Sequence, residues 1–98
     1  MVERYKVDHE LKIKPEYYNA VISGRKRFEI RKDDRNFKVG DVIRLEEFDI
    51  NLHMAYTGRS SLYEITFKLD GGEYGLEKGY CILSIKPYKT RTYLGITY

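Results

Sequence analysis

The stretch that decides the fold is HELKIKPEYYNAVISGRKRFEIR, residues 9–31, because a helical pattern lies in it between two alternating ones. Apolar and charged residues alternate from about residue 5 to residue 14, which is the period-two pattern of a half-buried strand. Pro15 suits the first turn of a helix, where its missing N–H leaves no hydrogen bond unmade. Gly24 supplies the left-handed residue that commonly ends a helix. We therefore expect a strand followed by a helix of about two to three turns.

A second strand is expected from residue 27 onward. Phe28 and Ile30 alternate there with Arg27, Glu29 and Arg31. Successive side chains of a strand point to opposite faces, so this pattern predicts an apolar inner face and a charged outer face.

Three further alternating segments predict strands over 42–48, 64–68 and 81–86, separated by glycine-containing turns. In the middle segment Ile65 and Phe67 fall on the same face. Short strands at regular spacing with one early helix predict a mainly β (α+β) fold. We expect a small β-barrel of about five strands, or a strongly curved sheet, because closure removes exposed sheet edges.

Length and composition fit a single domain over residues 1–98. The chain is 42% hydrophobic and 34% charged, which is too apolar for a disordered protein. Its apolar runs are far shorter than the roughly 20 residues that a membrane helix needs, and the N-terminus lacks the apolar segment of a secretory signal. These features predict a cytoplasmic protein with no membrane partner.

The residues that bind metals in proteins are few and scattered in this chain. There is one cysteine, Cys81, in an apolar run that indicates a packed thiol, and His9 and His53 are far apart in sequence. We therefore expect no metal and no cofactor. His9 shares its strand face with apolar neighbours, so we expect a packed, hydrogen-bonded residue at the edge of the core.

The formal net charge is +3, and the cations gather in one region. A basic stretch runs from residue 25 to residue 38, whereas carboxylates dominate residues 41–49 and 70–77. Such a stretch steers polyanions toward a site, although a solvated charged surface is the simpler alternative. The residues expected to steer in this way are Arg25, Arg27, Lys32 and Arg35.

The segment GRKRFEIR, residues 24–31, matches the G-x-K-x-x-E-x-R signature at all its fixed positions and resembles ASCH domains, which are similar to PUA-type RNA-binding folds. A wider stretch, about residues 8–87, resembles a bacterial and phage subgroup known as DUF3850. Residues 88–98 lie beyond it as an extension that adds an edge strand or is loose.

The resemblance implies a charged cleft built on Lys26, Glu29 and Arg31. Lys26 is expected to meet a phosphate or a carbonyl oxygen, and Arg31 offers a planar fork for a phosphate or a base edge. Glu29 could accept a hydrogen bond from a base amino group or hold Lys26 in place. The alternative is an ion cluster in which these three side chains satisfy one another.

Two tyrosines are candidates for stacking on bases. Tyr56 and Tyr74 both fall in segments expected to be glycine-containing loops that could border the cleft.

The leading hypothesis is a module that binds RNA. Some proteins that resemble ASCH domains are amidohydrolases acting on acetylated cytidine; Lys26 matches their lysine, but Glu29 stands where their threonine nucleophile would be. An enzyme of that kind, with Lys26 and Glu29 as candidate catalytic residues, is the alternative, as is a ribonuclease. A protein-interaction module is a further alternative. RNA or a nucleoside is thus the expected ligand, and a protein partner is the other possibility.

Overall fold

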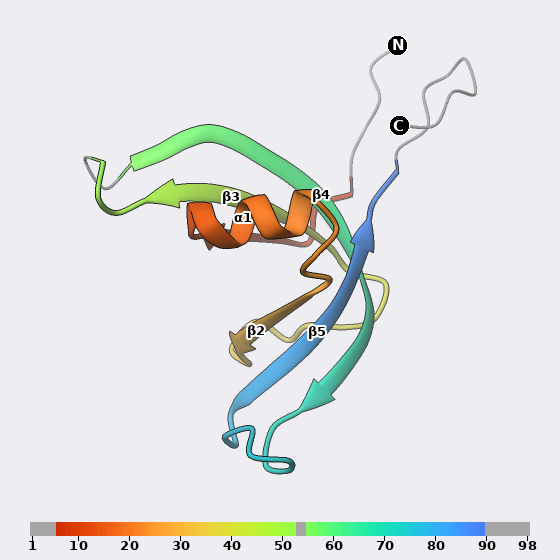
Figure 1. Ribbon diagram of the computed structural model, residues 1–98. Helices are drawn as coiled ribbons and strands as arrows, with labels where there is room; N and C mark the ends of the chain where they lie inside the picture. The colour runs from red at the N-terminus through yellow and green to blue at the C-terminus, as the bar shows by residue number, and fades with distance from the viewer. Residues whose placement is uncertain (1–5, 53–54, 90–98) are drawn as a thin grey trace.

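The computed structural model describes residues 6–52 and 55–89 (Figure 1). As the sequence predicted, the fold is mainly β, with a short helix after the first strand. The elements are β1 (His9–Ile13), α1 (Pro15–Ile22), β2 (Phe28–Lys32), β3 (Val42–Asp49), β4 (Ala55–Asp70) and β5 (Tyr80–Pro87).

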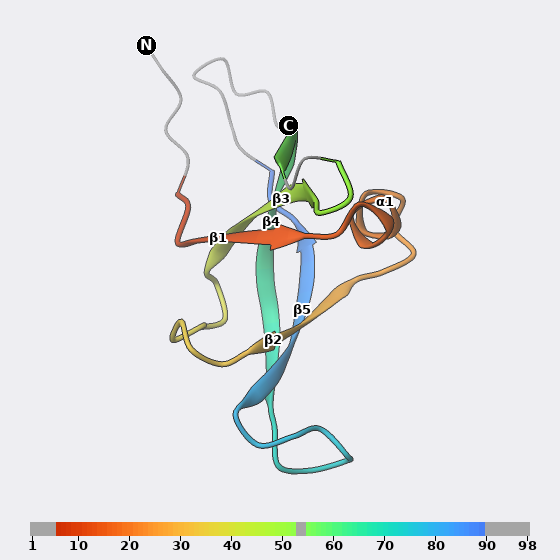
Figure 2. The same ribbon diagram turned by 90° about the vertical axis from the view of Figure 1, so that its left-hand side faces the viewer.

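All strands belong to one sheet with the order β1-β3-β4-β5-β2. β1 pairs with β3 in parallel, and the remaining pairs are antiparallel. The long strands β4 and β5 bend strongly, so the sheet curls into a half-barrel whose edges are β1 and β2 (Figures 1 and 2). The curl therefore brings the first two strands of the chain toward each other across an opening.

The helix α1 begins and ends where the sequence predicted. Pro15 is its first residue, and Gly24 adopts a left-handed conformation (φ 81°) just after its end. The backbone N–H groups of Arg25 and Lys26 both donate to the carbonyl of Ala20, at 3.0 Å each. This tight exit turns the chain directly into β2.

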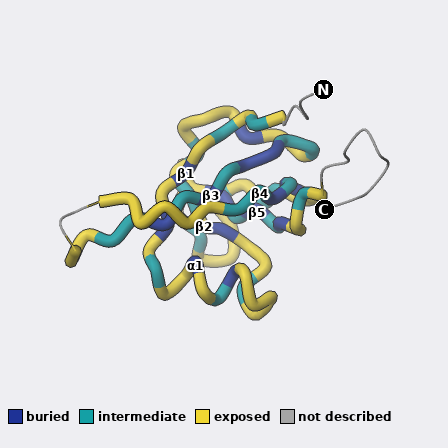
Figure 3. The backbone as a smooth tube through the Cα atoms, turned by 90° about the horizontal axis from the view of Figure 1, so that it is seen from above, coloured by how far each residue is buried: buried dark blue, intermediate teal, exposed yellow. Residues whose placement is uncertain are grey.

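The core lies between α1 and the inner face of the sheet (Figure 3). The helix buries Tyr18 and Val21, which are three residues apart and so lie on one face. Burial of each large apolar side chain contributes about 1.5–3 kcal/mol to stability. The core residues are Leu11, Ile13, Tyr18, Val21, Phe37, Ile43, Leu45, Tyr63, Ile65, Cys81, Leu83 and Ile85.

The predicted orientation of β2 is wrong. Phe28 and Ile30 are 41% and 53% exposed, whereas Glu29 is only 3% exposed. Glu29 pairs with Leu83, and Arg31 with Cys81, both of which belong to the core face of β5. The charged side of β2 therefore faces inward, and its apolar side faces outward.

The fourth strand is longer than predicted and is not regular. It extends from Ala55 to Asp70, because residues 55–64, which were not predicted to be a strand before position 64, pair with β3 along most of the length of β3. A register shift between Ile65 and Phe67 reverses the alternation of side chains. Ile65 is fully buried and Phe67 is 59% exposed, so the prediction that they share a face is wrong.

The other boundaries agree with the predictions except at the start of β1. β1 is shorter than expected and begins only at His9, while β3 and β5 lie within a residue or two of the predicted ranges. Residue 5, the predicted start of the first strand, lies outside the described residues. Residues 90–98 of the predicted C-terminal extension also lie outside them. In the ranges described, no helix has the length and apolar character needed to cross a membrane.

Candidate functional site

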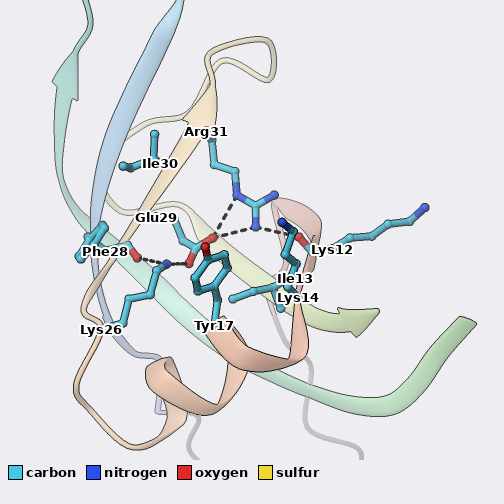
Figure 4. Close-up of a pocket in the computed structure, with 9 residues that line it drawn as sticks. All are labelled: Lys12, Ile13, Lys14, Tyr17, Lys26, Phe28, Glu29, Ile30 and Arg31. Atoms are coloured by element: carbon cyan, nitrogen blue, oxygen red, sulfur yellow. Dashed lines mark hydrogen bonds and ion pairs between the residues drawn. The ribbon is translucent and has the colours of Figure 1, made fainter. Parts of the chain in front are cut away.

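A cleft of about 520 Å³ opens where β2 faces the end of β1 and the start of α1 (Figure 4). The three signature residues Lys26, Glu29 and Arg31 meet in it. Its lining comprises Lys12, Ile13, Lys14, Tyr17, Lys26, Phe28, Glu29, Ile30 and Arg31. Both edges of the half-barrel and the helix thus contribute to one site.

The carboxylate of Glu29 forms the buried floor of this cleft. Its Oε1 accepts hydrogen bonds from Nε and Nη2 of Arg31, at 3.1 and 2.7 Å, and its Oε2 accepts one from Nζ of Lys26. A carboxylate has about four acceptor positions, so these three bonds leave about one for a ligand. The ion cluster foreseen as an alternative therefore exists, and it is not saturated.

Lys26 lies between the polar floor and two aromatic rings. Its Nζ donates to the backbone carbonyl of Phe28 at 2.7 Å and lies 4.8 Å from the centre of the Phe28 ring. The centre of the Tyr17 ring is 5.6 Å away on α1. Both rings are within the range of cation–π attraction. The ammonium uses two of its three N–H groups in the bonds to Glu29 and Phe28.

The rim of the cleft is cationic and aromatic. Lys12 and Lys14 are exposed at the junction of β1 and α1. Tyr17 and Phe28 are 45% and 41% exposed, so their rings are accessible from the solvent. Such a cleft can attract an anion, stack a planar ring and offer one buried acceptor to an N–H donor.

The four other predicted cations do not line this cleft. Arg25 donates to Oγ of Ser23, and Arg27 donates to the carbonyl of Gly24, so both bind within their own turn. Arg27 and Lys26 line a second hollow of about 360 Å³ beside the end of α1.

Lys32 and Arg35 lie at and beyond the far end of β2. Lys32 is exposed and pairs with Tyr80. Nη1 of Arg35 donates to the backbone carbonyl of Glu10 at 3.0 Å, which joins the segment after β2 to β1. These two cations are therefore separated from the floor of the cleft.

The two tyrosines proposed for stacking lie apart from each other. Tyr56 belongs to β4 rather than to a loop, and its ring packs edge-on against Phe48 at 5.1 Å. Nζ of Lys12 lies 5.7 Å from the Tyr56 ring, which connects this tyrosine to the rim of the cleft. Tyr74 is 89% exposed in the loop between β4 and β5 and does not line the cleft.

His9 and Cys81 are packed residues, as predicted. Nε2 of His9 lies 2.7 Å from Oδ2 of Asp41, and its ring contacts Phe37 edge-on. Burial alone would raise the pKa of Asp41, but hydrogen bonds from His9 and from the backbone N–H of Lys38 outweigh it, so this pKa is lowered. Burial raises the pKa of the Cys81 thiol.

A second buried carboxylate, Glu47, was not foreseen from the sequence. The register shift after Glu46 brings Glu47 next to Thr57 and Arg59. The Thr57 hydroxyl donates to Oε1 of Glu47 at 2.6 Å, and Nη1 of Arg59 lies 3.7 Å from its Oε2. The Arg59 guanidinium also lies over the ring of Tyr18 and donates to Asn19. This cluster connects β3 and β4 to α1. Across residues 6–52 and 55–89 no three metal-binding side chains are grouped together.

Comparison with known proteins identifies the family. Residues 8–85 match the family described as "Domain of unknown function (DUF3850)", and the chain belongs to this family, as the sequence predicted. It is also similar to the "Uncharacterized 12.9 kDa protein in GpA 3'region" of Escherichia phage P2, with 40% identity over 58 residues. That alignment covers 59% of this chain and 50% of the phage protein, so the chain spans about half the length of the curated relative it matches.

Proposed function

We propose that this chain is an RNA-binding module of the ASCH/PUA-like kind, and that its cleft receives a nucleotide of a single-stranded segment. One observation carries the proposal: the buried Glu29 lies between Lys26 and Arg31 at the floor of a cleft whose rim is cationic and aromatic. The G-x-K-x-x-E-x-R resemblance supports the same function, because these are its signature residues.

Each part of a nucleotide has a suitable partner in the cleft. The exposed ammonium group of Lys14 suits a phosphate, and the partly buried Lys26 has one N–H left to donate to it. The exposed ring of Tyr17 suits a base, since stacking is tolerant of base identity. The remaining acceptor position of Glu29 suits an exocyclic amino group.

The hydrolase alternative receives less support from the same geometry. The described residues that line the cleft include no serine, threonine or cysteine to act as a nucleophile. Glu29, the candidate general base, already accepts hydrogen bonds from two cations. Binding without covalent chemistry therefore explains the site with fewer assumptions.

The proposal is tested by titrating a labelled short single-stranded RNA with the wild type and two rim variants. Lys14→Ala removes one phosphate contact, so we expect weaker binding and a slope of log K against log salt that is smaller by about 0.7. Tyr17→Ala removes a stacking surface worth about 1–3 kcal/mol, which is about 5- to 150-fold in affinity. Both residues are exposed, so folding should be preserved.

Matched controls lie on the loop between β4 and β5, away from the cleft. Lys78→Ala and Tyr74→Ala remove the same types of exposed side chain and should leave affinity unchanged. A wild type that binds no RNA at low salt, or rim and loop variants that bind alike, would contradict the proposal. Variants of Lys26 or Arg31 are less suitable, because they leave the buried Glu29 without a partner.

A further inference from the structure

The outward side of β2, β5 and β4 carries apolar side chains in rows across the strands. Phe28 pairs with Ser84, which pairs in turn with Phe67, and the row beside it contains Ile30, Ile82 and Leu69. We call this surface the outer apolar face; it comprises Phe28, Ile30, Phe67, Leu69, Tyr80 and Ile82.

Several members of this face are strongly exposed. Phe67 and Ile30 are 59% and 53% exposed, and Phe28 and Tyr80 are about two-fifths exposed. Phe67 lies here only because the register shift after Ile65 turns it outward. A contiguous exposed apolar surface on a small protein often marks an interaction site.

The backbone spacing in the row of the two phenylalanines is wide enough to admit a planar base between the two rings. Neighbouring strands lie about 4.8 Å apart, so the backbones at Phe28 and Phe67 are about 10 Å apart, with the small Ser84 between them. A planar base in contact with a ring on each side needs about 7 Å, since aromatic contacts are about 3.5 Å. Ser84 lies between the two phenylalanines in the register, and a serine hydroxyl can donate to or accept from a base edge.

The outer apolar face continues directly from the cleft. Phe28 and Ile30 line the cleft and also belong to the face, because β2 is an edge strand. In Figure 4 their side chains point away from Glu29 and Arg31, toward the side of β5. A chain leaving the cleft over this edge would therefore reach Phe67 next.

Cations accompany this path. Nζ of Lys26 lies 4.8 Å from the centre of the Phe28 ring, so a nucleotide stacked on this ring has an ammonium beside it. Lys32 and Lys86 lie in register positions on either side of the phenylalanine row, and one carboxylate, Glu64, pairs with Lys86. Lys26 and Lys86 favour a polyanion at the phenylalanine row, whereas the carboxylates Asp70, Glu73 and Glu77 lie toward the loop between β4 and β5.

We propose that the outer apolar face is a second contact surface for single-stranded RNA, on which a base stacks between Phe28 and Phe67. The inference rests on the proposed function and specifies its ligand: a strand several nucleotides long rather than a mononucleotide or a duplex. Duplex RNA keeps its bases stacked on one another and cannot place a base between the rings of Phe28 and Phe67.

Phe67 allows the face to be tested separately from the cleft, because it does not line the cleft. We expect Phe67→Ala to weaken binding of a single strand long enough to reach both surfaces by about 5- to 150-fold. Its salt dependence should not change, and neither should the binding of a mononucleotide. The side chain is 59% exposed, and thermal unfolding checks that the variant remains folded.

A fluorescence experiment reports the stacking directly. The sequence contains no tryptophan, so Phe67→Trp introduces a single reporter. Single-stranded RNA should quench its emission, whereas a matched Tyr74→Trp reporter, at a residue that belongs neither to the cleft nor to the outer apolar face, should keep its emission. Equal responses of the two reporters would overturn the inference.

The remaining outcomes separate this inference from the proposed function. If Phe67→Ala binds RNA like the wild type while Lys14→Ala and Tyr17→Ala bind more weakly, the face is not an RNA surface and the cleft remains one. If the wild type binds no RNA, both proposals fail. If Phe67→Ala abolishes self-association in sedimentation and leaves RNA affinity unchanged, the face is a protein contact.

Discussion

Among single residues, Glu29 carries a buried charge that depends on two cationic partners. Its buried carboxylate holds Lys26 and Arg31, and removal of its charge would leave two cations side by side without an anion. We expect Glu29→Gln to lower the free energy of unfolding by about 3 kcal/mol, the lower end of the range for broken buried ion pairs, because both cations remain partly hydrated. Urea denaturation measures this change.

Glu10→Gln provides the matched control for that measurement. The carboxylate of Glu10 lies 3.8 Å from Nε of Arg44, and its side chain is 62% exposed. An exposed ion pair of this kind contributes at most about 1 kcal/mol. Similar losses in the two variants would show that the Glu29 cluster does not stabilise the fold.

The same residue shows what the sequence could and could not predict of the site. The spacing of Glu29 and Arg31 predicted that they act together, because side chains two apart on a strand share a face, and the family resemblance added Lys26. Hydrophobicity predicted the wrong face for Glu29, since a charge is buried only when partners satisfy it. Its partners come from the turn before β2 and from β2 itself. Lys12, Lys14 and Tyr17 were missed because only the tertiary fold brings them to the cleft.

At the level of elements, Gly71 controls the exit from β4. A Cβ at this position would lie 2.1 Å from the carbonyl oxygen of Glu77 and 2.7 Å from that of Tyr80. Both atoms belong to the backbone, so the loop must shift to admit a methyl group. We expect Gly71→Ala to lower the free energy of unfolding by about 1–3 kcal/mol, as overpacking does.

Thermal unfolding of a neighbouring variant makes this test specific. Glu73 lies exposed in the same loop, and Glu73→Ala should change the melting temperature little. A Gly71→Ala protein as stable as the wild type would mean that the loop adjusts freely.

Elements with strong local signals were predictable, and those that depend on pairing were not. α1 has Pro15 at its start and Gly24 after its end, and these signals placed it correctly. The first half of β4 has a polar sequence, and pairing with β3 makes it a strand. The register shift that exposes Phe67 leaves no signature in the alternation of residues, because a bulge changes parity without changing composition.

For the molecule as a whole, the decisive feature is the opening between the two edges of the half-barrel. The sequence predicted a curved sheet, but the parallel pairing of β1 with β3 depends on contacts between distant segments. β1 and β2 lie at opposite ends of the strand order. Arginine side chains cross this opening: Arg31 donates to the carbonyl of Lys12 at 2.8 Å, and Arg35 to that of Glu10 at 3.0 Å.

These two bridges fix the distance between the edges, and hence the width of the cleft. We expect Arg35→Ala to remove about 1 kcal/mol of local stability from β2, the net value of a typical hydrogen bond. Hydrogen exchange of the β2 amides should then be about fivefold faster, because edge segments open locally without global unfolding.

The strand pair β3–β4 supplies the internal reference for this measurement. Both strands lie in the interior of the strand order and do not pair with β2, so their amides should keep their exchange rates. Arg27→Ala is the matched control, since Nε of Arg27 donates to Gly24 within the same turn and crosses no opening. Faster exchange in both variants, or in β3 and β4 as well, would show that Arg35 stabilises the fold generally. Acceleration confined to β2 would show that its guanidinium holds the second edge of the half-barrel in place beside the first.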